Sequence, residues 1–207
     1  RGLGDVYKRQ KLDVKKEGGN LILTANYKLG NLDKAQWTIH PDGMATLDYT
    51  YNFSGVVDLM GICFDYPEEQ VLSKRWLGAG PYRVWQNRIH GTQYDIWEND
   101  YNDPIPGETF TYPEFKGYFG SVSWMSIRTK EGTISLRNET PDSYIGVYQP
   151  RDGRDRLLYT LPESGISVLN VIPPVRNKVN STDLCGPSSQ PKWVDGPQTG
   201  RLVLRFE

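Results

Sequence analysis

Apolar and polar residues alternate with a period of two along much of this chain. Residues 45–53 show the pattern most clearly, because every second residue is apolar. Such strict alternation is typical of a β-strand with one buried face. Its predicted core face is Ala45, Leu47, Tyr49, Tyr51 and Phe53. Other segments predict further strands at residues 21–29, 36–39, 57–64, 94–97, 122–128, 133–136, 144–148, 165–171 and 201–206.

Turn signals separate the predicted strands. Pro41-Asp42-Gly43 interrupts one apolar segment, and Lys130-Glu131-Gly132 links two strands as a hairpin. Residues 67–70 predict a single helical turn with Pro67 at its first position. The sequence has no repeat and no long amphipathic helix. Many short strands with turns between them predict an all-β fold, an antiparallel supersandwich.

Composition narrows the function classes. A net charge of −1 excludes the basic footprint of a nucleic-acid-binding protein. A mean hydropathy of −0.59, without a long apolar run, excludes a membrane span. Cys63 and Cys185 lie far apart and do not have the spacing of a metal site. Two buried thiols are favoured over one disulfide, because cysteine is often buried, but both states remain open.

The first ten residues differ from the rest of the chain. The segment RGLGDVYKRQ is cationic and shows no apolar period. We expect residues 1–10 to be a non-native or disordered leader. Residues 11–207 then form a single β-sandwich domain, which we expect to be the C-terminal part of a longer protein and to lack the first strands of its fold.

Residues 75–126 contain four of the six tryptophans and the densest set of candidate functional groups. Gly78, Gly80 and Pro81 predict a sharply turned backbone, since glycine tolerates positive φ and proline fixes φ. Arg83 and other polar residues follow, beside large aromatics. Aromatic rings stack on the apolar face of a pyranose while polar groups bond its hydroxyls. A sugar site and a sandwich core with paired polar groups are both open interpretations.

Four ordered motifs point to a known family. They are Trp-Leu-Gly-Ala-Gly-Pro at 76–81, Asn-Arg at 87–88, Tyr-Pro-Glu-Phe-Lys-Gly at 112–117, and Trp124. Together they resemble the C-terminal β-sandwich domain of family 2 glycoside hydrolases, which ends large bacterial β-galactosidases. The resemblance runs from residue 21 to residue 206. Pro-Glu replaces the family's usual Pro-Gln-Glu, so the chain resembles a divergent branch whose sugar is open.

The resemblance implies a fold like that of galactose mutarotase-like domains. It implies a non-catalytic domain of a retaining β-glycosidase, β-galactosidase-like, which covers the catalytic barrel and helps to shape the sugar pocket. Both catalytic glutamates would lie on the barrel, so we expect this chain alone to be inactive. The expected partners are a carbohydrate and an upstream catalytic barrel of the same polypeptide, with no nucleic acid and no membrane. No cofactor is implied, although the parent enzyme could hold Ca²⁺, and the parent is expected to be periplasmic or secreted in a bacterium.

The candidate carbohydrate-binding residues are Arg83, Asn87, Arg88, Glu114 and Trp193. We expect the first four to form a partly buried polar cluster beside Trp76 and Trp85, because a buried charge needs a partner.

Trp193 lies in residues 173–200, a segment rich in proline, serine and glycine. Three prolines limit its freedom, so we expect a shaped loop with few conformations. By resemblance, Trp193 would point toward the active site of the barrel. The alternative is an ordinary loop tryptophan on the sandwich edge.

Two other functions remain open at this stage, a stand-alone carbohydrate-binding module and a mutarotase-like aldose epimerase. The epimerase would use His40 and His90 with Glu114 as acid and base, whereas surface histidines are the simpler interpretation. Glu68 and Glu69 are adjacent and would point apart on a strand.

Glu98, Asp100, Asn102 and Asp103 offer oxygen ligands for Ca²⁺. Solvated acidic turns are the favoured interpretation for both groups of carboxylates.

Overall fold

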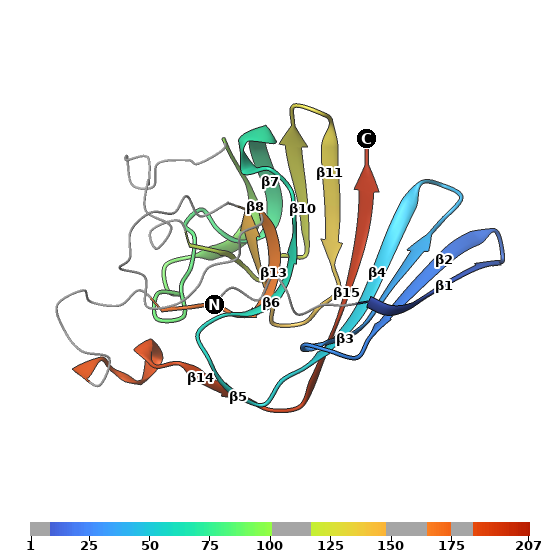
Figure 1. Cartoon of the computed structure of the whole chain (residues 1–207). Helices are drawn as coiled ribbons and strands as arrows, with labels where there is room; N and C mark the ends of the chain where they lie inside the picture. Colours follow the sequence, from blue (N-terminus) through green and yellow to red (C-terminus); the bar gives the residue numbers. More distant parts are fainter. Residues whose placement is uncertain (1–8, 101–116, 148–164, 175–183) are drawn as a thin grey trace.

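The computed structural model describes residues 9–100, 117–147, 165–174 and 184–207. Almost all regular structure in these residues is antiparallel β-sheet (Figure 1). The prediction of an all-β, sandwich-like fold is therefore confirmed.

A nine-stranded sheet forms the larger layer. In spatial order its strands are β1 (Arg9–Glu17), β2 (Asn20–Tyr27), β3 (Leu32–Ile39), β4 (Met44–Asn52), β15 (Pro197–Phe206), β11 (Thr133–Asn138), β10 (Trp124–Thr129), β7 (Val71–Gly80) and β8 (Gln93–Asp100). The smaller layer contains β6 (Met60–Phe64), β13 (Ile166–Val171), β12 (Tyr144–Val147) and β9 (Phe119–Gly120). A third, two-stranded sheet pairs β14 (Lys192–Val194) with β5 (Gly55–Val57).

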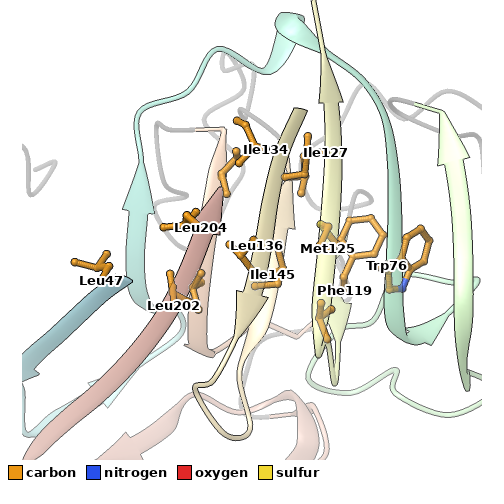
Figure 2. Packing of buried hydrophobic residues seen from close by; sticks show 14 of the residues in the cluster. Leu47, Trp76, Phe119, Met125, Ile127, Ile134, Leu136, Ile145, Leu202 and Leu204 are labelled. Carbon is orange, nitrogen blue, oxygen red and sulfur yellow. The ribbon is translucent and has the colours of Figure 1, made fainter. Parts of the chain in front are cut away.

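The core lies between the two larger sheets. Trp76, Met125, Leu136 and Leu204 stand directly opposite one another on adjacent strands, so their side chains share one face. All four are buried, and they belong to one apolar cluster with Ile145 and other residues of the smaller sheet (Figure 2). The alternating pattern of the sequence thus becomes a continuous apolar row across the larger sheet.

Strand β4 confirms the clearest sequence pattern. Ala45, Leu47, Tyr49 and Tyr51 are all buried, as the period of two predicts. Tyr51 also donates a 2.6 Å hydrogen bond from its phenol to Asn170 Oδ1 on β13, which ties the two sheets together. Burial raises the pKa of Tyr51, so the phenol keeps its proton and remains a donor.

Three departures from the sequence-based expectations concern β1, the segment at residues 57–64 and β7. Strand β1 begins at Arg9, two residues inside the segment that was set apart as a leader. The strand predicted at residues 57–64 is divided at Asp58 and Leu59 between β5 and β6, which belong to different sheets.

The third departure is the backbone of β7. The sharp turn predicted at residues 78–81 is wrong for the glycines, because β7 stays extended through Gly80. Glycine at these two positions allows neighbouring atoms to lie close to the β7 backbone. A Cβ on Gly78 would lie 3.0 Å from Gly120 O, and one on Gly80 would lie 2.5 Å from Trp97 Cδ1.

Two further expectations concern the state of the two cysteines and the single helical turn. Cys63 and Cys185 are both thiols, as favoured, but Cys63 is exposed and Cys185 is only half-buried, so the expected burial is wrong. The predicted helical turn is present as η2 (Glu68–Gln70), and a second short turn is η5 (Pro187–Ser189). Within the described ranges, no helix has the length and apolarity needed to cross a membrane.

Candidate functional site

A tight turn follows β7 and carries the polar motif. Val84 and Tyr118 exchange backbone hydrogen bonds of 2.7 and 3.0 Å, and Trp85 and Arg88 exchange another pair of 3.2 and 2.9 Å. The Trp85 ring is 6% exposed and packs edge-on against Tyr118, with ring centroids 5.8 Å apart. Trp85 is therefore an anchor and is not available to stack on a sugar.

The tip of this turn holds the segment before β14. Gln86 Nε2 donates to Ser188 O at 2.8 Å and to Gln190 O at 2.7 Å. Asn87 Nδ2 donates to Ser189 Oγ at 2.8 Å. We call Gln86 and Asn87 the latch, since together they fix residues 188–190 against the body of the sandwich.

The latched segment leads directly into β14. Trp193 pairs with Val56 on β5, so their side chains lie on the same face of the two-stranded sheet. Trp193 is 71% exposed and Val56 is 61% exposed. We call these two side chains on the β5–β14 pair the ledge.

The far end of the ledge is also fixed. Ser54 Oγ donates to Asp195 Oδ1 at 2.6 Å and accepts from Gly196 N at 3.1 Å. Residues 184–196 are thus held at both ends, but β14 and the start of β15 at Pro197 lie inside the segment predicted as a loop, and residues 175–183 lie outside the described part of the chain.

The predicted polar cluster is only partly assembled. Arg83 and Asn87 are half-buried, whereas Arg88 is exposed, so the expected burial of Arg88 is wrong. Glu114 lies outside the described residues. Trp85, which lies within the polar turn, and Trp76, which lies on β7, belong to two different apolar clusters. Asn87 serves as a latch residue, and its partner in that task, Gln86, was not among the candidates.

The two histidines do not form a catalytic pair. His40 lies in the β3–β4 turn and contacts Thr46 Oγ1 at 3.0 Å, whereas His90 lies in the β7–β8 loop. Strand pairing places these turns at opposite ends of the larger sheet. Four inter-strand spacings of about 4.8 Å also separate β4 from β7. The epimerase arrangement of His40 with His90 is therefore wrong.

The acidic candidates are exposed. Glu69, Glu98 and Asp100 are at the surface, and Asn102 and Asp103 lie outside the described residues. No group of three or more His, Cys, Asp or Glu side chains that could hold a metal ion occurs within residues 9–100, 117–147, 165–174 and 184–207.

Two features were not anticipated from the sequence. Lys74 is 2% exposed, with its ammonium 5.9 Å from the Phe119 ring centroid and 3.1 Å from Asp100 O. A polar cavity is lined by residues 121–122, 138 and 140–144. The only signal for it was the run Asn-Glu-Thr-Pro-Asp-Ser at 138–143, a concentration of turn-forming residues between two strands.

Comparisons with known proteins do not assign this fold and site to a family. No protein-family model matches the sequence, and no curated protein is significantly similar to it.

We expect Gln86→Ala to release the latched segment. The substitution removes two hydrogen bonds to backbone carbonyls, so opening of residues 185–190 should become easier by about 1–2 kcal/mol. Hydrogen exchange of the amides in that segment measures the change. Arg88→Ala in the same turn is the matched control, and its exposed side chain predicts a change within about 0.5 kcal/mol. Equal protection in both variants would show that Gln86 is not a latch.

Proposed function

We propose that this chain is a non-catalytic, sugar-binding domain of a retaining β-glycosidase, β-galactosidase-like, that works beside a catalytic barrel. The observation that supports it is the ledge, where Trp193 is 71% exposed on a short strand that is fixed at both ends. A large exposed indole is a suitable platform for the apolar face of a pyranose.

The ledge is held at both ends, and this is the second observation that supports the proposed function. A loop that must be ordered on binding loses affinity, whereas a platform fixed beforehand does not. Gln86 and Asn87 fix one end of the segment and Ser54 fixes the other. Val56 extends the apolar strip beside the indole ring. Such a ledge offers stacking but few polar contacts, so the remaining hydroxyls of the sugar would be bound by the barrel.

A stand-alone carbohydrate-binding module is the second candidate. The ledge supports this second function because both strands of the platform belong to this chain. The two functions differ in affinity. A module must bind a saccharide usefully by itself, whereas a domain that completes the pocket of a barrel needs only weak binding.

We expect Trp193→Ala to leave the melting temperature nearly unchanged and to weaken saccharide binding by about 1–3 kcal/mol, the range for one lost stacking platform. Calorimetric titration with a β-galacto-oligosaccharide measures the binding. Phe206→Ala removes another exposed aromatic, at the far end of β15, and should not change it.

Three results would contradict the proposal. One is a large loss of stability in Trp193→Ala with unchanged binding, which would make Trp193 a core residue. Another is equal weakening by Phe206→Ala. The third is hydrolysis of nitrophenyl β-galactoside by this chain alone.

A further inference from the structure

A cavity of about 320 Å³ lies where the chain crosses twice between the two larger sheets. Residues 121–123 lead from β9 to β10, and residues 139–143 lead from β11 to β12. The volume is within the range of small-ligand pockets. Its lining residues are Ser121, Val122, Asn138, Thr140, Pro141, Asp142, Ser143 and Tyr144.

One set of polar groups builds the wall. Asn138 Nδ2 donates to Ser143 Oγ at 2.7 Å and to Val122 O at 3.2 Å, while its Oδ1 accepts from Thr140 N at 3.1 Å. Thr140 Oγ1 accepts from Arg201 N at 3.0 Å, which ties the wall to β15. These groups are already paired, so the wall is preformed.

A second set of polar groups remains available to a ligand. Within the part of the chain that the structure describes, the Ser121 hydroxyl, the Asp142 carboxylate and the Tyr144 phenol have no hydrogen-bond partner. Burial and the nearby Asp142 charge raise the pKa of Tyr144, so its phenol stays protonated and can donate. Asp142 can only accept, whereas the two hydroxyls can do both.

The backbone at this cavity is unusual. Among the described residues, Ser121 (φ 51°) and Asp142 (φ 50°) are the only non-glycine residues with positive φ, and both line the cavity. Left-handed residues other than glycine are uncommon and concentrate at binding sites. One such residue lies on each crossover, and each presents one of the available polar groups.

We propose that this cavity binds a neutral, polyhydroxylated ring, that is, a single pyranose unit. The Asp142 carboxylate requires donors, which adjacent sugar hydroxyls supply, and its charge disfavours phosphate or carboxylate ligands. Ser121 and Tyr144 can bond the other hydroxyls, and Pro141 adds apolar surface for the ring. The site is separate from the ledge and does not depend on Trp193.

Backbone-amide NMR of the whole chain, titrated with methyl β-galactopyranoside and methyl β-glucopyranoside, tests the proposal. We expect saturable shifts at Ser121, Asp142 and Tyr144 with at least one of the two sugars. Asp142→Asn keeps the shape and tolerates the left-handed conformation. It should weaken binding about 10-fold by removing a charged acceptor.

Two further variants make the result decisive. Tyr144→Phe should also weaken binding while preserving the fold. Asp65→Asn changes another exposed carboxylate, in the loop after β6, and should bind as the unmodified chain does. The proposal is overturned if the three cavity amides do not shift, or if Asp142→Asn and Tyr144→Phe both bind with unchanged affinity.

The same titration separates this proposal from that of the ledge. Shifts confined to the Trp193 indole N–H would support the ledge and overturn the cavity. Shifts confined to the cavity amides would support the cavity and leave the ledge unsupported.

Discussion

Replacing Trp76 by Ala is expected to lower the free energy of unfolding by about 3–5 kcal/mol, the cost of deleting a large buried aromatic. Trp76 is 1% exposed and packs edge-on against Phe119, with ring centroids 4.7 Å apart. Its indole N–H also donates to Ala79 O at 3.1 Å. The variant thus loses apolar contacts, leaves a cavity and removes one hydrogen bond to the Ala79 carbonyl. Chemical denaturation monitored by circular dichroism measures the loss.

Trp193→Ala is the matched control for this prediction, since it removes the same side chain from an exposed position. It should change the free energy of unfolding by less than about 0.5 kcal/mol. Similar losses in both variants would mean that burial does not decide the contribution of each tryptophan. Trp76→Phe should recover part of the stability, because a ring remains to contact Phe119.

The strand pattern of the sequence was a good guide wherever one face of a strand is buried. In β4, burial follows the apolar positions, and the predicted hairpin at residues 130–132 joins β10 to β11. The pattern failed for β7, because its glycines were interpreted as turn residues. A glycine can serve a turn, or it can leave room for a neighbouring side chain or backbone atom. Which of the two applies depends on what packs against the glycine in the folded chain. Gly80 stands opposite Gln93 in the β7–β8 pair, and the Trp97 ring reaches it from four residues further along β8, where its indole N–H donates to Gln93 O.

The candidate site, like the strands, could be predicted from the sequence only in part. The resemblance directed attention to Asn87 and Trp193, and the structure places both on one connected unit, one as latch and one as ledge. Gln86 was missed because a glutamine in a polar run gives no sign of which carbonyls it will meet. The cavity was missed because Ser121 and Asp142 come together only when both crossovers between the sheets are in place.

Replacing Gly61 by Ala is the second prediction with a large effect, a loss of about 3 kcal/mol or more in the free energy of unfolding. Gly61 on β6 stands opposite Leu169 on β13. An added Cβ would lie 2.2 Å from Val168 O and 2.6 Å from Leu169 Cα. Both atoms are backbone, so no side chain can rotate away, and the two strands must separate.

Separation of β6 from β13 should also reach the candidate site. Leu169 is buried in the apolar cluster that contains Trp85 and Tyr118, and this cluster anchors the latch turn. In Gly61→Ala we therefore expect faster hydrogen exchange at residues 185–190 in addition to the global loss of stability. Gly186→Ala is the matched control, because nothing lies within 4 Å of its added Cβ and its φ of −64° suits alanine. Unchanged exchange in a destabilised Gly61→Ala would show that the smaller sheet and the latch are energetically independent, and that the ledge needs only its own hydrogen bonds to stay in place.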